Sequence, residues 1–365
     1  MRRKTKLFSL KDKQLAKEII SKIKKIDITL RFMHVCGTHQ DTLVKNGLDV
    51  LLKKCGIEIG QGPGCPVCVT TPTEIEEMLL LAKSGKTVTT FGDMMKVPGE
   101  KQSLSSMKTE GYDIRTVYGI EDAVDIAKKN KDKEVVFMAV GFETTAPTTA
   151  AVMLKDPPRN FSILSCHRTI PNALKAILDM GEIKIDGLIE PGHVSTIIGT
   201  EPYEFISKDY HVPQVIAGFE PIDLLMSSWM LFKQIKNNEV FVQNEYTRVV
   251  NKEGNIKAKR AIKEVFEPED KKWRGFPTIP KSGLKLNKKF EEHNASKIYE
   301  DELKEIKDKD YTEPKGCRCG ELLRGLATPQ ECKLFGKKCT PDNPVGPCMV
   351  SIEGSCNIEY RYLQK

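Results

Sequence analysis

The cysteines are the residues of this 365-residue chain most able to do chemistry, and they are unevenly placed. Six of the 11 lie within the last 49 residues, at Cys317, Cys319, Cys332, Cys339, Cys348 and Cys356. The total is odd, and the sequence shows no export signal, because Lys11, Asp12 and Lys13 interrupt any apolar leader. The cytosol keeps thiols reduced, so we expect a cytoplasmic protein that uses its cysteines for metal binding or redox chemistry.

The spacing of the C-terminal cysteines differs from that of a zinc finger. Cys317, Cys332, Cys339 and Cys356 are separated by 14, 6 and 16 residues. Structural zinc sites usually contain Cys-x-x-Cys pairs, and this segment has none. Four thiolates from separate turns favour an iron–sulfur cluster, and zinc or disulfides remain the alternatives.

Two shorter motifs nearer the N-terminus also carry thiols. In Gly62–Cys68, the pair Cys65 and Cys68 can close a disulfide, hold a metal or form half of a zinc site. We expect this pair just before a helix rather than in its first turn. Cys36 ends a strand-like run, and helix N-terminal amides after it would favour its thiolate. His39 follows as a possible base, ligand or hydrogen-bond donor, with simple packing as the alternative.

Weaker polar signals follow three later strand-like runs. They are Gly141–Pro147, Glu190–Thr196 and His167-Arg168. Hydroxyl, acidic and histidine side chains at strand ends suit a polar site that faces the first domain, or they cap helices. The first two segments lack the spacing of a phosphate-binding P-loop.

Alternating strand and helix patterns must position these motifs. The expected elements are a strand at 28–35, a helix at 38–55 with a Thr38–Asp41 capping box, a strand at 57–59, a helix at 72–85, a strand at 87–91 and an apolar helix at 224–232. This alternation predicts parallel sheets with ligand loops at the carboxyl ends of the strands.

The strand motifs occur twice, which indicates two similar α/β domains. Phe32–Gly37 resembles Phe137–Phe142, and Pro63-Gly64 has a counterpart in Pro191-Gly192, although chance similarity between buried strands is the alternative. The fold class expected is α/β, with two parallel-sheet domains and a small Cys-rich iron–sulfur domain. The expected parts are an N-terminal helix at 1–27, a first α/β domain at 28–130, a second at 131–250, a helical connection at 251–310 and the Cys-rich domain at 311–365.

Composition argues against two classes of partner. The net charge is +7, but basic residues are interspersed with acidic ones, whereas a nucleic-acid binder gathers them on one stripe. The longest uncharged run, Ile59–Thr73, has 15 residues and contains three glycines and three prolines. A membrane span needs about 20 apolar residues. We therefore expect neither nucleic acid nor membrane as a partner.

Together these motifs resemble the HypD family of [NiFe]-hydrogenase maturation proteins over roughly residues 28–360. The resemblance rests on Met33–His39, Gly62–Cys68, Phe91–Met94, Gly141–Pro147, Pro191–His193, Trp273–Gly275, Ser282–Leu286, Gly346–Val350 and the spacing of the C-terminal cysteines.

The resemblance implies a scaffold and redox protein that assembles the Fe(CN)2CO unit of the hydrogenase with the small chaperone HypC and with HypE, which delivers cyanide. It implies that Cys36, Cys65 and Cys68 surround the iron being assembled. It also implies a [4Fe-4S] cluster on Cys317, Cys332, Cys339 and Cys356, and an electron relay through Cys319 and Cys348. The alternatives are a cluster-dependent thiol–disulfide reductase resembling ferredoxin:thioredoxin reductase, and a zinc-stabilised interaction protein.

Overall fold

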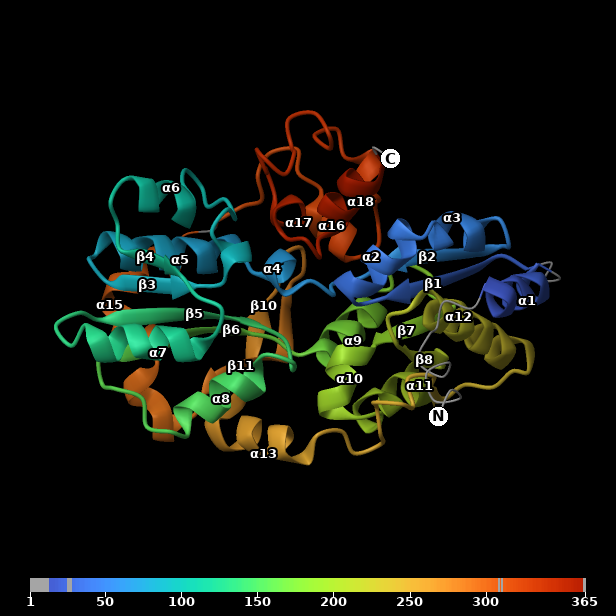
Figure 1. Ribbon diagram of the computed structural model, residues 1–365, viewed down its shortest axis with the longest axis horizontal. Helices are drawn as coiled ribbons and strands as arrows, with labels where there is room; N and C mark the ends of the chain where they lie inside the picture. The colour runs from blue at the N-terminus through green and yellow to red at the C-terminus, as the bar shows by residue number, and fades with distance from the viewer. Residues whose placement is uncertain (1–12, 25–27, 308, 310, 364–365) are drawn as a thin grey trace, which may run out of the picture.

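The computed structural model describes residues 13–24, 28–307, 309 and 311–363. Two α/β domains lie side by side, and a Cys-rich C-terminal segment, residues 311–363, covers the junction between them (Figure 1). Each domain is built around one parallel sheet, which confirms the predicted α/β class. We name them the β1 domain and the β5 domain after an inner strand of each sheet.

The β1 domain contains a five-stranded parallel sheet in the order β2-β1-β7-β8-β9. Its strands are β1 (Leu30–His34), β2 (Ile57–Gln61), β7 (Gly187–Pro191), β8 (Gln214–Ala217) and β9 (Val242–Asn244). The helices around it are α1 (Lys13–Ile23), α2 (Gly37–Lys45), α3 (Leu48–Lys53), α9 (Ile170–Met180), α10 (Gly192–Ile198), η2 (Glu201–Tyr203), α11 (Glu204–Tyr210) and α12 (Pro221–Lys236). Apolar side chains of α1, α2, α3 and α12 share one core with β1 and β7, and α10 packs against β7 and β8.

The β5 domain contains a four-stranded parallel sheet in the order β4-β3-β5-β6. Its strands are β3 (Thr87–Thr90), β4 (Ile114–Thr116), β5 (Val135–Gly141) and β6 (Phe161–His167). Its helices are α4 (Pro66–Val69) at the junction with the β1 domain, then α5 (Pro72–Lys83), η1 (Gly92–Met94), α6 (Leu104–Thr109), α7 (Ile120–Lys129) and α8 (Ala146–Met153). All seven residues of β5 are buried, as expected for a strand covered on both faces.

The two sheets are interleaved in the chain rather than consecutive. The β1 sheet takes two strands from before the β5 sheet and three from after it. The expected division at residue 130 would therefore separate β3 from β5, which pair directly, and would join β5 to β7, which lie in different sheets. Elements that are consecutive in sequence are usually neighbours in space, and this tendency favoured a division in chain order.

Two expected helices differ in detail. The segment 38–55 forms α2 and α3, because the chain turns at Gly47 between them. The Thr38–Asp41 capping box does not form, since the N-cap residue of α2 is Cys36, with no side-chain cap. Residues 1–12 and 25–27 of the expected N-terminal helix lie outside the described residues, and α1 occupies the remainder.

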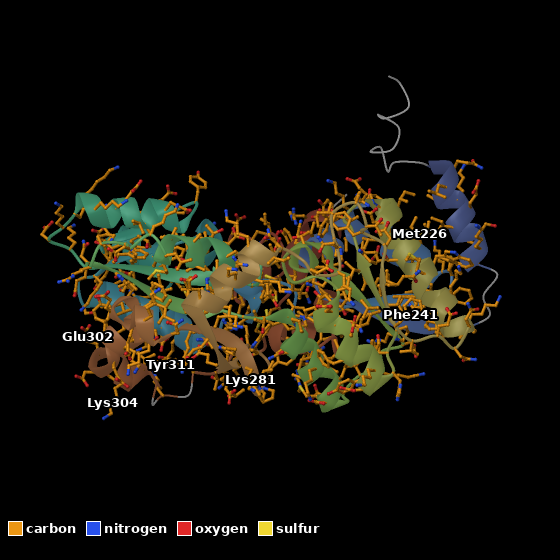
Figure 2. All side chains as sticks on the ribbon, turned by 90° about the horizontal axis from the view of Figure 1, so that it is seen from below. Met226, Phe241, Lys281, Glu302, Lys304 and Tyr311 are labelled. Atoms are coloured by element: carbon orange, nitrogen blue, oxygen red, sulfur yellow. A yellow bond between two sulfur atoms is a disulfide. The ribbon has the colours of Figure 1, made fainter. Side chains whose placement is uncertain are left out.

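The expected helical connection contains a β-hairpin. Its elements are α13 (Ile256–Val265), β10 (Phe266–Lys272), β11 (Thr278–Leu286), η3 (Lys288–His293), α14 (Ala295–Ile298) and α15 (Glu300–Lys307). The strands β10 and β11 pair antiparallel, and β11 packs on β6 and α9. The many charged residues of β10 obscured its strand character. In Figure 2, Glu302 and Lys304 lie at the end of the molecule opposite Met226 and Phe241, and Lys86 donates to Glu302 over 2.7 Å, which ties α15 to the β5 domain.

The C-terminal segment has only short elements. They are α16 (Cys319–Leu323), η4 (Pro329–Glu331), α17 (Pro347–Val350) and α18 (Ser355–Leu363). Across the described ranges, every helix falls short of the length and apolar character that crossing a membrane requires.

Candidate functional site at the domain junction

Cys36 lies at the carboxyl edge of the β1 sheet. It follows β1 and is the N-cap residue of α2, with φ −151° and ψ 126°. Its side chain is buried, and backbone hydrogen bonds from His39 and Thr38 stabilise the thiolate as expected. Burial nevertheless outweighs them and raises the pKa of Cys36 to about 11. The N-terminal amides of α2 thus favour the thiolate as expected, but in the isolated thiol desolvation is the larger effect.

His39 lies one turn into α2 and is completely buried. Burial lowers its pKa to about 3, so the imidazole is neutral at physiological pH. Within the described part of the chain neither ring nitrogen makes a well-aligned hydrogen bond, although the backbone of Ala217 and Gly218 lies close enough to the ring to act against the lowering of its pKa. The ring packs against Phe219 at a centroid distance of 5.2 Å, and Phe219 stacks on His193 at 3.8 Å. A neutral imidazole keeps one N–H for a ligand or for a sulfur atom.

Cys65 and Cys68 lie beside Cys36. They form a disulfide with a Cα–Cα distance of 5.2 Å, and both are buried. Cys65 is the N-cap residue of α4, and the Cys68 N–H donates to its sulfur over 3.2 Å. The pair thus lies before α5, as expected, but it also occupies the first turn of the short helix α4, which was not predicted from the sequence. Gly64 packs against the backbone of Cys36, where any side chain would overlap it, so the two thiol loops are in direct contact.

Glu353 of the C-terminal segment approaches Cys36, and Asp93 lies near Glu353. The Thr38 hydroxyl donates to Glu353 of the C-terminal segment over 3.5 Å, and the negative charge of Glu353 adds to the raised pKa of Cys36. The Ser351 hydroxyl donates to Asp93, just after β3, over 3.3 Å. Sequence reasoning noted Asp93 only within a motif and missed Glu353, since a lone glutamate in a loop gives no pattern to detect.

The six C-terminal cysteines lie in the C-terminal segment, where α16 and α17, which carry Cys319 and Cys348, pack on α4. The Cys319 thiol is in hydrogen-bonding contact with Cys317, Cys348 and Cys356. The Cys339 sulfur accepts the Val345 N–H over 3.3 Å. Burial, and then negative charge on Cys317 and Cys332, raise the pKa of Cys339. Cys317 is partly exposed, whereas Cys319, Cys332, Cys339, Cys348 and Cys356 are buried.

This donor set fits a thiolate-ligated cluster in its chemistry. It offers several buried sulfurs from separate turns, with backbone N–H groups directed at one of them. No three His, Cys, Asp or Glu side chains of the described residues converge as ligands of a single metal ion. A four-iron cluster does not require such convergence, because each cysteine binds a different iron atom.

The later polar motifs are divided between the two domains, with Glu190 in strand β7 of the β1 domain and Glu143 just after β5 of the β5 domain. Glu190 is completely buried, and among the described residues neither of its carboxyl oxygens has a hydrogen-bond partner. Burial raises its pKa to about 8. Glu143 is also buried, accepts the Ile170 N–H over 3.0 Å and has a pKa raised by burial to about 7. Because Glu190 ends β7, the strand next to β1, it belongs to the same sheet as Cys36 and not to a second domain facing it.

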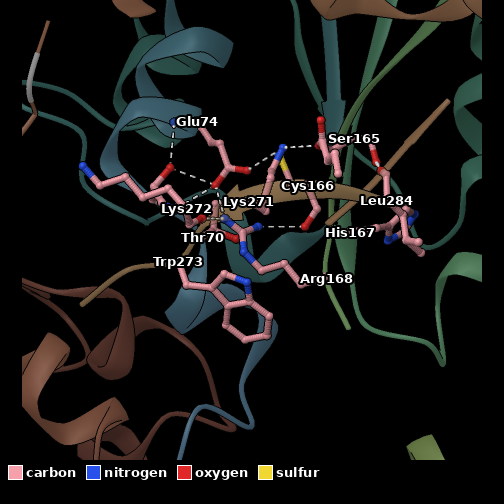
Figure 3. Close-up of polar contacts among 12 residues, drawn as sticks. Thr70, Glu74, Ser165, Cys166, His167, Arg168, Lys271, Lys272, Trp273 and Leu284 are labelled. Atoms are coloured by element: carbon pink, nitrogen blue, oxygen red, sulfur yellow. Dashed lines mark hydrogen bonds and ion pairs between the residues drawn. The ribbon is translucent and has the colours of Figure 1, made fainter. Parts of the chain in front are cut away.

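His167 and Arg168 do not join the Cys36 site. Arg168 is 1% exposed and donates to Glu74 of α5 over 2.6 Å and to the Lys272 carbonyl over 2.8 Å. Lys271 lies 3.5 Å from the other carboxyl oxygen of Glu74 (Figure 3). This buried ion network ties α5, the end of β6 and the hairpin together, and its role is structural.

Known proteins are similar to the chain over nearly its whole length. A family model described as "HypD: Hydrogenase formation hypA family" matches residues 11–363. A putative hydrogenase expression/formation protein of Methanocaldococcus jannaschii is 48% identical over 364 residues, covering 98% of this chain and 99% of the relative. Hydrogenase maturation factors of Bradyrhizobium diazoefficiens (HypD2) and Cupriavidus necator (HypD) are each 41% identical, covering 91% of this chain and 89% of the relative.

Proposed function

The chain belongs to the HypD family of hydrogenase formation proteins, and from this membership we propose that it holds iron while the Fe(CN)2CO unit of a [NiFe]-hydrogenase is assembled. HypC and HypE are the proposed partners. The observation that carries the proposal is the contact between the Cys36 loop and the Cys65–Cys68 loop at the carboxyl edge of the β1 sheet. Iron that carries cyanide and CO prefers soft sulfur ligands, and these adjoining segments carry three cysteines.

Cys36 would bind the substrate iron as a thiolate. Its burial favours the neutral thiol, with a pKa of about 11, so a proton must leave when the metal arrives. The positive charge of the iron then offsets the desolvation cost that keeps the free thiol protonated. The neutral His39 beside it can donate its single ring N–H to a diatomic ligand or to the sulfur. Burial of both residues excludes competing water from the iron.

The C-terminal segment would supply electrons. Cys317, Cys332, Cys339 and Cys356 are the proposed holders of a [4Fe-4S] cluster, which donates or accepts single electrons when bound. Cys319 and Cys348 are the proposed relay, and their thiols are already in contact. Cys65 and Cys68 can alternate between disulfide and dithiol next to Cys36, which would couple electron transfer to the assembly of the iron unit.

A cluster-dependent thiol–disulfide reductase is the second candidate function. The presence of a disulfide beside a sulfur-rich segment supports it. The burial of the pair opposes it, because Cys65 is 0% and Cys68 is 1% exposed, and a protein disulfide would have to reach them. Multiple turnovers on a free protein disulfide in the absence of a HypC partner would favour the reductase.

The decisive experiment replaces Cys36 by Ser and purifies the full chain anaerobically with its HypC partner. Oxygen is a harder ligand than sulfur, and a hydroxyl does not ionise at neutral pH, so Ser should not hold the iron. We expect at least a tenfold loss of the CN and CO infrared bands and of hydrogenase maturation, with the fold and the iron of the C-terminal segment unchanged. His39→Ala should weaken the bands less completely.

Cys55→Ser is the matched control, since Cys55 is a buried cysteine distant from the site, in the core of the β1 domain. Normal bands and maturation with Cys36→Ser would show that the proposed iron site is wrong, and the reductase function would gain.

A further inference from the structure

The turn of the β10–β11 hairpin holds the far end of the helix that carries Cys65 and Cys68. The backbone N–H of Arg274 donates to the Val69 carbonyl over 2.9 Å. The Arg274 Nε donates to the Thr70 carbonyl over 2.8 Å. These two carbonyls follow directly after Cys68 and would otherwise be unpaired at the end of a four-residue helix. Arg274 therefore fixes where α4 ends.

The same turn touches the segment that carries Cys319. Gly275 has φ +78° and lies against the backbone of Gly320, the residue after Cys319. A Cβ atom on Gly275 would overlap Gly320, so only glycine permits this approach. Helix α4 in turn packs directly on α16 and α17, which carry Cys319 and Cys348. One turn thus contacts both sulfur-bearing regions.

The turn is itself rigidly anchored in the β5 domain. Trp273 is completely buried and stacks on Phe142 at a centroid distance of 5.8 Å. Its indole N–H donates to the Ser282 hydroxyl over 2.8 Å, and the Arg168 guanidinium lies 5.7 Å from its ring centre (Figure 3). The Arg274 Nη1 donates to Glu313 of the C-terminal segment over 2.6 Å. The anchor can therefore hold α4 and the C-terminal segment at a fixed separation.

We propose that Arg274 and Gly275 are positioning residues that set the contact between the Cys65–Cys68 pair and the Cys319–Cys348 pair. The reaction that depends on this contact is dithiol–disulfide exchange. The Cys65–Cys68 bond breaks and gains two electrons and two protons, and the Cys319 and Cys348 thiols supply both as they form a disulfide. This inference rests on the electron relay of the proposed function.

Burial makes this contact the route for electrons. Cys65 and Cys68 are 0% and 1% exposed, so a reductant in solution cannot touch their disulfide. Cys317 is partly exposed and its thiol contacts Cys319. The partly exposed Cys317 side is therefore where a small dithiol approaches: it reduces the Cys319–Cys348 disulfide formed in the exchange, becomes a cyclic disulfide itself, and so restores both thiols.

The test measures how fast dithiothreitol reduces the Cys65–Cys68 disulfide in the full-length chain. The protein is purified anaerobically, and samples are quenched by thiol alkylation and mapped by mass spectrometry over time. Gly275→Ala should slow reduction of this disulfide at least tenfold. Gly336→Ala is the matched control, because Gly336 also has positive φ, +67°, lies in the C-terminal segment and has open space around its Cβ position. Its rate should stay within twofold of wild type.

A double substitution separates positioning from general loosening. In a Cys348→Ser background, Gly275→Ala should cause no further slowing, because both changes interrupt the same route. An additive effect, or faster reduction in Gly275→Ala, would overturn the proposal. Arg274→Lys adds no bulk and keeps the charge, but a lysine cannot donate to the Thr70 carbonyl and to Glu313 at the same time. This variant should therefore also slow reduction at least threefold. A wild-type rate for Arg274→Lys would overturn the proposal even if Gly275→Ala fails to fold.

This assay reads thiols in the isolated chain and does not require hydrogenase maturation. If Cys36→Ser matures hydrogenase normally, the proposed function fails, while slow reduction in Gly275→Ala would still support the positioning role. If Cys36→Ser loses maturation but Gly275→Ala reduces at the wild-type rate, the proposed function stands and the positioning role is wrong.

Discussion

The β1 and β5 domains and the C-terminal segment hold their sulfur atoms in place by different means. In the two domains, parallel strands covered by helices form the core, and Cys36, Cys65 and Cys68 lie at the starts of α2 and α4 at its edge. In the C-terminal segment the helices have only four to nine residues, and the cysteines themselves fill the interior. We expect the first arrangement to be stable before any ligand binds and the second to depend on what its sulfurs bind.

The largest expected effect comes from replacing a cysteine of the C-terminal segment. Cys339→Ala, or Cys332→Ala, should abolish iron and sulfide binding and increase amide hydrogen exchange over 311–363 at least tenfold, because the metal substitutes for a core. The two sheets should keep their protection, since their cores do not depend on the cluster. Iron analysis and exchange mass spectrometry measure both effects. Full iron and sulfide in either variant would refute the ligand assignment.

The same contrast explains what the sequence could predict. The helix expected at 72–85 and the strand patterns depend on neighbouring residues, so they were visible in the sequence, and the parallel α/β class follows from them. The pairing of β1 with β7 joins residues about 155 apart, and no local pattern encodes it. The prediction of parallel α/β sheets was therefore correct, but the assignment of consecutive strands to each domain was wrong.

At the site, sequence reasoning found the thiols but not their surroundings. Cys36 and Cys65 lie in glycine-containing motifs whose chemistry is evident from residue types alone. The burial that raises the pKa of Cys36 and the approach of Glu353 both come from segments distant in the sequence. Long-range packing, rather than the local helix terminus, decides the protonation state of the thiol.

The second-largest effect tests the core of the domains without touching a cysteine. Arg168→Ala leaves Glu74 buried with only Lys271 as its cationic partner, and breaking a buried pair costs about 3–5 kcal/mol. Urea unfolding followed by circular dichroism measures the loss. Iron content should be unchanged, because Arg168 stabilises the β5 domain rather than the cluster. Lys175→Ala, which removes an exposed ion pair with Asp179, is the control and should have much less effect.

The pH dependence of this pair has a definite sign. Burial alone would raise the pKa of Glu74, but Arg168 and Lys271 hold it at about 2. A carboxyl with a lowered pKa stabilises the fold above its unfolded value of about 4.5 and loses that contribution as the pH falls towards 2. In Arg168→Ala the loss should begin at higher pH. An unchanged acid-unfolding profile would contradict this.

An effect of opposite sign is expected at Glu190. Burial raises its pKa to about 8, so the fold favours the protonated acid. Its contribution is complete below about pH 4.5 and declines as the pH rises through 8, by about 1.4 kcal/mol for each pH unit in between. Glu190→Gln removes the charge and should be increasingly more stable than wild type between pH 5 and 8. Glu204→Gln on the exposed start of α11 is the control, and a constant difference across this range would contradict the argument.

The smallest expected effect comes from removing a sulfur in the domain core. Cys55 is 4% exposed and packs with Leu52 and Ile57 in the core of the β1 domain. A buried free cysteine behaves there as a small apolar side chain, so Cys55→Ala should cost only about 1 kcal/mol of unfolding free energy. Iron, sulfide and the exchange pattern of 311–363 should match wild type. Loss of iron in Cys55→Ala would mean that cysteine substitutions disturb the cluster from a distance, and the contrast between the two kinds of sulfur would then fail.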